Sequence, residues 1–138
     1  MGAVSYCIHN ILSPEAATGN YILEEHAERL FSQAASYGDE LWIANYTDVT
    51  KYYHEWSSAV VTDSYDAASG TITVSLTDSE RDDIYDMALT VKVTVPTSWE
   101  TCLVNGSETV KVYTDDNGVS YVYVNIIPDS GVVTITNG

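Results

Sequence analysis

His9 is the residue of this sequence best placed to transfer a proton. It follows the apolar run Val4–Ile8, which is typical of a buried strand, and it precedes a loop that contains Pro14 and Gly19. In parallel α/β folds, active sites gather at the carboxyl ends of strands, and an imidazole there can donate or accept a proton near neutral pH. His9 is therefore a candidate general acid or base, although a hydrogen-bonded histidine at a domain edge has the same pattern.

Tyr121 and Tyr123 are candidates for stacking against a sugar. They alternate with Val122 and Val124 along one predicted strand, so both rings point away from its apolar face. An exposed ring there offers an apolar face and a polar hydroxyl to a ligand. The same alternation fits a strand that is covered on both faces, in which case the rings fill a core. Core packing is expected for four other large aromatic residues, which follow apolar patterns: Trp42, Tyr52, Tyr53 and Trp56.

No group of residues in this sequence has the spacing of a metal site. The patterns His-Glu-x-x-His and Cys-x-x-Cys are absent. Residues 78–83 begin with acids at alternate positions, but a calcium loop would have glycine at Asp83 and glutamate at Leu89, so we expect a solvated hairpin loop. His54 and Glu55 are neighbours on a predicted helix and point in different directions, so we expect both on a solvated helix face.

Residues 1–57 must position His9, and they have the pattern strand, helix, strand, helix. Apolar residues recur at helical spacing from Leu23 to Ala34. Asn20 is the expected N-cap of this helix, and Gly38 is its expected C-terminal stop.

A second buried strand is predicted at Leu41–Ala44, and Thr47 is the expected cap of a second helix. Two such strand–helix units cannot close a parallel sheet, because the edges of the sheet stay unpaired. Residues 1–57 therefore look like the end of a larger α/β domain, and their exposed edge predicts association with another chain.

Residues 58–138 change to a period of two, which is typical of strands. Asn105-Gly106 and Asp116-Asn117-Gly118 are hairpin signals. Seven short strands separated by turns predict an all-β immunoglobulin-like sandwich. The expected strands are 59–65, 71–77, 88–95, 99–104, 108–114, 119–127 and 132–136.

Composition narrows the possible partners of the chain. Its 138 residues include 20 acidic and 5 basic ones, so the formal net charge is −15. Phosphate backbones and anionic membrane surfaces would be repelled, so neither nucleic acid nor a membrane is an expected partner. No apolar run is long enough for a membrane span, and no secretion signal is visible. Cys7 and Cys102 lie in apolar strand patterns and are expected to be buried free thiols. A disulfide between them would need their Cα atoms to lie under about 7 Å apart.

The order of these pieces resembles the C-terminal end of the polysaccharide deacetylases with the NodB-homology fold. In that family a late barrel strand ends in a histidine, and a helix, a Leu-Trp-Ile-Ala strand and an Asp-Val-x-Lys-Tyr helix follow. The corresponding segments are Ile8–Ile11, Leu41–Ala44 and Asp48–Tyr52. Some members append a small β-domain, which residues 88–93 and 128–131 also resemble.

This resemblance implies that residues 1–57 end a (β/α)-barrel catalytic domain and that residues 58–138 form an appended sandwich. The parent protein would be a hydrolase that removes acetyl groups from carbohydrate, with a divalent metal, usually zinc, to activate water. His9 would be its general acid. The metal ligands of the family lie upstream of the matching segment, so this chain would bind no metal and would be inactive alone. The resemblance also implies an extracellular or cell-envelope location.

Two other functions are compatible with the sequence. Residues 58–138 would be a non-catalytic carbohydrate-binding module if Tyr121 and Tyr123 stack against sugars. They would be a purely structural sandwich if those rings serve only packing.

Overall fold

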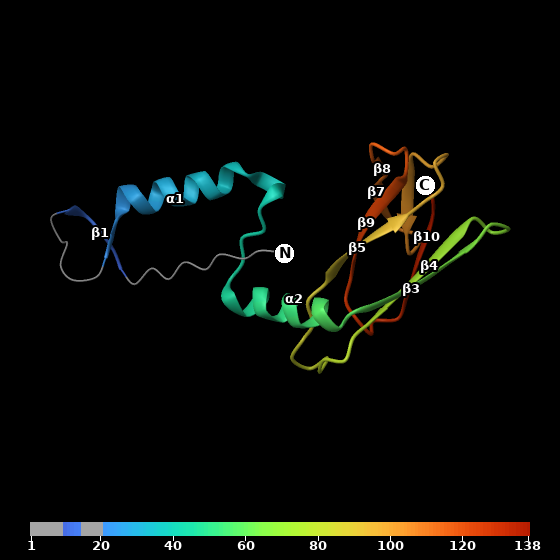
Figure 1. Cartoon of the computed structure of the whole chain (residues 1–138), viewed down its shortest axis with the longest axis horizontal. Helices are drawn as coiled ribbons and strands as arrows, with labels where there is room; N and C mark the ends of the chain where they lie inside the picture. Colours follow the sequence, from blue (N-terminus) through green and yellow to red (C-terminus); the bar gives the residue numbers. More distant parts are fainter. Residues whose placement is uncertain (1–9, 15–20) are drawn as a thin grey trace. The chain divides into compact units, whose positions relative to one another are not determined.

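The computed structural model describes residues 10–14 and 21–138. The chain divides into two compact units between Tyr46 and Thr47 (Figure 1). In the first unit, two short strands pair in parallel and a helix follows. These elements are β1 (Ile11–Leu12), β2 (Ile22–Leu23), α1 (Glu24–Ser36) and the 3-10 helix η2 (Gly38–Glu40).

Helix α1 forms where the apolar spacing predicts it, but its ends are set differently. Leu23 is its N-cap, with an extended backbone and no side-chain hydrogen bond, and the predicted cap Asn20 lies outside the described residues. Gly38 has φ of +51°, the left-handed conformation expected after a helix C-terminus. Ala27 is buried, whereas Phe31 on the same predicted stripe is 54% exposed.

The predicted strand at Leu41–Ala44 is wrong. This segment connects η2 to the next helix without strand pairing, and Trp42 and Ile43 are exposed. A short apolar run becomes a strand only where a neighbouring strand completes its backbone hydrogen bonds. The described part of residues 1–57 therefore holds one parallel pair of two-residue strands and shows no barrel.

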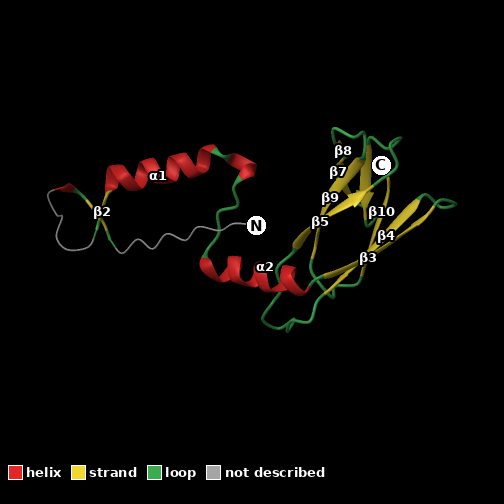
Figure 2. Ribbon diagram, viewed as in Figure 1, coloured by secondary structure: helices red, strands yellow, loops and turns green. Residues whose placement is uncertain are grey.

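The second unit consists of one helix and two antiparallel sheets (Figure 2). The five-stranded sheet has the order β3-β4-β10-β6-β7, and the three-stranded sheet has the order β5-β9-β8. Neither α1 nor the helix of this unit is long and apolar enough to cross a membrane. The elements are α2 (Tyr46–Ser58), β3 (Val60–Asp66), β4 (Thr71–Thr77), β5 (Leu89–Thr94), β6 (Thr101–Val104), β7 (Glu108–Lys111), β8 (Tyr113–Thr114), β9 (Ser120–Ile126) and β10 (Val132–Asn137).

The inner faces of the two sheets share one hydrophobic core, which makes the unit a β-sandwich. Alternate residues of each strand enter this core because side chains along a strand point to opposite faces. The buried residues come from both sheets: Ile72, Val74, Leu76, Cys102, Val104, Val133 and Ile135 from the larger one, and Leu89, Val93, Val122, Val124 and Ile126 from the smaller one.

The strand order differs from that of an immunoglobulin domain. In immunoglobulin constant domains the last strand joins the sheet that holds the third and sixth strands. Here the last strand, β10, lies between β4 and β6 in the larger sheet. Its pairs Val133↔Val74 and Ile135↔Ile72 keep the apolar residues of both strands on the core side. The alternation predicts which side chains face the core, but it does not predict which strand is the neighbour.

The predicted strand 108–114 is two strands in different sheets. Its first half, β7, pairs with β6, and its second half, β8, pairs with β9. The chain leaves one sheet and enters the other at Val112, which packs against the core. A strand that changes sheets in this way makes a corner of a sandwich.

Both predicted hairpins are confirmed. Asn105 and Gly106 have φ of +50° and +71°, and the Ser107 N–H donates to the Val104 carbonyl oxygen at 3.1 Å, as in a type I′ turn. In the β8–β9 turn, the Asp115 carboxylate accepts from the backbone N–H groups of Asn117 and Val119.

Candidate functional site

Three tyrosines gather on the outer face of the three-stranded sheet. Tyr121 and Tyr123 point outward from β9, opposite to the buried Val122 and Val124. Tyr113 of β8 pairs with Tyr121 across the sheet and joins them. Tyr113 is 43% exposed and Tyr123 is 48% exposed, so the rings lie at the surface and do not fill a second core. We call Tyr113, Tyr121 and Tyr123 the tyrosine surface.

The rings of the tyrosine surface contact one another. Tyr113 and Tyr121 are stacked, with centroids 5.8 Å apart and planes at 21°. Tyr123 meets Tyr121 edge to face at 5.3 Å and 73°, and its centroid is 5.9 Å from that of Tyr113. Aromatic pairs prefer such offset and edge-to-face arrangements. The three rings therefore form one contiguous aromatic cluster.

Tyr121 is the central ring of this surface. Its partner Tyr113 comes from β8 on one side of β9, and the Lys92 ammonium comes from β5 on the other, with Nζ 3.8 Å from the Tyr121 ring centroid. Burial and the hydrogen bond to Tyr123 raise the pKa of the Tyr121 hydroxyl, which therefore stays neutral at physiological pH. The two better-exposed rings, Tyr113 and Tyr123, are the ones that a ligand can reach.

Polar groups surround the rings. The Thr90 hydroxyl donates to the Asn125 side-chain oxygen at 2.8 Å across the β5–β9 pair. Lys111, at the end of β7, places its Nζ 5.4 Å from the Tyr113 ring centroid. Apolar surface with a few polar groups around it is the usual composition of a small-molecule site.

Two shallow hollows of the second unit are lined by residues other than the three tyrosines. One of about 280 Å³ is lined by small polar residues of β3 and β4, among them Thr62, Ser64 and Thr73, and by Val132. Another of about 160 Å³ lies between β3 and β5 and includes Lys92 in its lining. Tyr113 and Tyr123 thus lie on an exposed face of the sheet, outside both hollows.

The other candidate residues are not brought together. His9 and Cys7 lie outside the described residues, so a proton-transfer role for His9 stays a prediction. Cys102 is a buried free thiol, and burial raises its pKa. In the loop 78–83, the Arg81 guanidinium donates to both carboxylate oxygens of Asp83, at 3.0 Å and 2.7 Å. Across residues 10–14 and 21–138, no three histidine, cysteine, aspartate or glutamate side chains are arranged to hold a metal ion.

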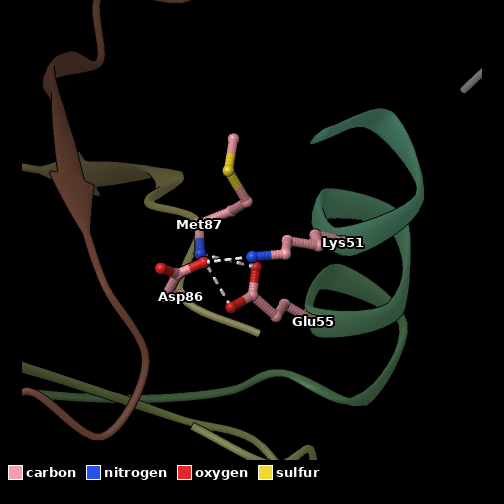
Figure 3. Close-up of polar contacts among 4 residues, drawn as sticks. All are labelled: Lys51, Glu55, Asp86 and Met87. Atoms are coloured by element: carbon pink, nitrogen blue, oxygen red, sulfur yellow. Dashed lines mark hydrogen bonds and ion pairs between the residues drawn. The ribbon is translucent and has the colours of Figure 1, made fainter. Parts of the chain in front are cut away.

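Glu55 is the clearest difference between the sequence prediction and the structure. We expected it on a solvated helix face, but its exposed fraction is 0%. Both carboxylate oxygens accept the Met87 backbone N–H, at 2.9 Å and 3.1 Å (Figure 3). One turn earlier on α2, Lys51 donates to Asp86 at 2.7 Å. Helix α2 is thus held against the segment before β5 through polar side chains.

The expected apolar face of α2 faces solvent instead. Tyr53 and Trp56 are exposed, and Tyr52 packs against the edge of the core. The prediction of core packing was therefore wrong for Tyr53, Trp56 and Trp42. A helical stripe predicts that these residues share a face, but the contacts of Glu55 and Lys51 decide which face docks.

The pKa of the Glu55 carboxyl is raised, chiefly because burial disfavours its charged form. The Met87 hydrogen bond and Lys51 act in the opposite direction, while Asp78 and Asp86 add to the rise. A raised folded-state pKa means that the folded chain holds a proton which the unfolded chain has already released. The contribution of Glu55 to stability is therefore largest below its unfolded pKa and is lost as pH rises through the folded pKa.

The variant Glu55→Gln should lack this pH dependence, so comparing its stability with that of the wild-type chain isolates the contribution of Glu55. Glutamine keeps an oxygen for the Met87 N–H but cannot ionise. From pH 4 to pH 7, the free energy of unfolding of the wild-type chain should fall relative to that of Glu55→Gln. Urea titrations at each pH measure both values. Parallel stability curves would show that Glu55 does not titrate differently in the two states.

Comparison with known proteins finds similarity to a gellan lyase and none to a deacetylase. No family model matches the chain, and no solved structure matches it. A curated gellan lyase from a Bacillus species is 35% identical over 104 residues, which cover 72% of this chain. The chain spans only 4% of the length of that lyase, so the match reaches one small region of a much larger protein.

The resemblance to the NodB-homology deacetylases is therefore wrong. The matching protein is named as a lyase acting on gellan, and no deacetylase model matches. The residues that suggested the family are short apolar runs, and Leu41–Ala44, one of them, is not a strand in the structure. Runs of this kind satisfy the packing needs of many folds, so their order alone does not identify one. The similarity that the comparisons show is to a small region of a gellan lyase.

Proposed function

We propose that the second unit is a non-catalytic carbohydrate-binding module of a polysaccharide-acting protein. The observation that carries this proposal is the tyrosine surface, in which Tyr113 and Tyr123 are exposed on an ordered sheet. The C–H face of a sugar ring is apolar and slightly positive, so it complements the negative face of an aromatic ring. Thr90, Asn125 and Lys92 lie on the same face of the sheet, and their polar groups would bind hydroxyl groups of the sugar.

The comparison with the gellan lyase supports the same class of ligand. Because the chain covers so little of that enzyme, the catalytic activity of the enzyme is not carried over. A module of this kind would keep a protein on its polymeric substrate, which would lie outside the cell. We therefore propose an extracellular or cell-envelope location as well. No property of the described residues suggests nucleic acid or a membrane as a partner.

Binding of the full chain to gellan and to neutral polysaccharides tests this function. In affinity electrophoresis, the chain should be retarded by polymer in the gel. Tyr123→Ala should weaken that binding at least about fivefold, as loss of an aromatic anchor at a binding surface usually does. Tyr123→Phe keeps the ring and should bind nearly as well as the wild type.

Tyr53→Ala is the matched control, because Tyr53 is an equally exposed tyrosine on α2 and has no contact with the tyrosine surface. Its binding should be unchanged. If the wild-type chain binds none of the polymers, the module proposal fails and the sandwich is a structural domain.

A further inference from the structure

The two basic side chains at the tyrosine surface differ from the other basic residues of the second unit. Lys51 pairs with Asp86, and Arg81 pairs with Asp83. Lys92 and Lys111 form no ion pair with a carboxylate of the described residues. Both ammonium groups lie over tyrosine rings instead, Lys92 over Tyr121 and Lys111 over Tyr113.

The ammonium groups of Lys92 and Lys111 have hydrogen-bond donors that remain available to a ligand. A cation within about 6 Å of a ring centroid is attracted by the face of the ring. That contact holds the lysine in position but satisfies none of its N–H donors. Both lysines are exposed, so their donors can reach an anion that lies along the tyrosine surface.

The tyrosine surface carries positive charge in a chain that is otherwise strongly acidic. The formal net charge is −15, with only 5 basic residues. In β5, β9 and β8, the three strands that form the surface, Lys92 is the one charged residue. Asp115 lies in the adjoining turn, where one oxygen of its carboxylate accepts the backbone N–H groups of Asn117 and Val119. An anionic polymer is repelled by most of this protein and finds local positive charge beside the rings.

We propose that Lys92 and Lys111 make the tyrosine surface selective for acidic polysaccharides, whose sugar units carry carboxylate groups. This inference rests on the proposed carbohydrate-binding function. The rings would contact the apolar face of one sugar unit, and the ammonium groups would donate to carboxylates of the same or neighbouring units. A neutral chain would gain only the ring contacts. Specificity is a difference of affinities, and here the lysines supply the difference.

The test compares an acidic polymer with its neutral counterpart on the full chain. Gellan and carboxyl-reduced gellan share a backbone and differ in the carboxylate. We expect gellan to bind more tightly, and the double variant Lys92→Gln/Lys111→Gln to lose about tenfold in affinity for gellan with little change for the reduced polymer. Lys92→Arg/Lys111→Arg keeps both charges and should keep the preference.

Arg81→Gln is the matched control, since it removes one positive charge from a loop beside α2. It should leave the preference for gellan unchanged. Equal binding of both polymers, with Tyr123→Ala weakening both and the lysine variants weakening neither, overturns the inference and leaves the module proposal standing. Binding of neither polymer overturns both.

Discussion

Replacing Trp99 by alanine should lower the free energy of unfolding by about 3–5 kcal/mol, the cost of removing a large buried aromatic side chain. Trp99 is only 8% exposed and belongs to the core between the two sheets. Its ring meets that of Tyr65 edge to face, with centroids 6.5 Å apart and planes at 76°. Surrounding strands cannot collapse into the space that the ring leaves, because their positions are set by the sheet hydrogen bonds.

Urea unfolding followed by far-ultraviolet circular dichroism measures this loss without relying on tryptophan fluorescence. Trp56→Ala is the matched control, since Trp56 is 49% exposed on α2 and should cost less than about 1 kcal/mol. A loss below about 1 kcal/mol for Trp99→Ala would show that this ring does not contribute to the packing of the core. Trp99 would then be a second candidate for ligand stacking.

Replacing Glu55 by alanine should cost about 1–3 kcal/mol, because the Met87 N–H then loses its acceptor in a partly buried position. The loss is smaller than for an ordinary buried hydrogen bond to a charge, since the variant also relieves the cost of burying a carboxylate. The change should be local first. Amide hydrogen exchange at Met87 should accelerate, as the segment before β5 separates from α2.

Glu80→Ala is the matched control for Glu55→Ala. Glu80 is a partly exposed acid next to the same helix, with Oε1 3.8 Å from the His54 Nδ1. A surface contact of this kind contributes little, so its loss should cost less than about 1 kcal/mol. If Glu55→Ala and Glu80→Ala are equally mild and Met87 exchange is unchanged, then Glu55 does not hold α2.

The strands of the second unit could be predicted because their signals are local. Ile72, Val74 and Leu76 alternate with polar residues, and all three are buried as the alternation requires. Asn105-Gly106 needs positive φ at both positions, and its turn is where expected. Period and turn chemistry act over a few residues, so the sequence alone determines them.

Two features of the second unit depended on the tertiary structure, and so did the failure of the family resemblance. Glu55 is buried because its acceptor oxygens meet Met87, 32 residues later in the chain. Tyr113 joins the tyrosine surface because the chain changes sheets at Val112 and pairs β8 with β9. The resemblance to a deacetylase failed for the same reason, since it took the apolar run Leu41–Ala44 as a strand without knowing its neighbours.

The same contrast applies to the candidate binding surface. The alternation with Val122 and Val124 determined that Tyr121 and Tyr123 share a face, because side chains of a strand have a period of two. Whether that face meets solvent or another layer depends on which segments pack there, and no local pattern records this. Only the tertiary structure decided that the rings are exposed, that Tyr113 completes them, and that Lys92 and Lys111 lie beside them.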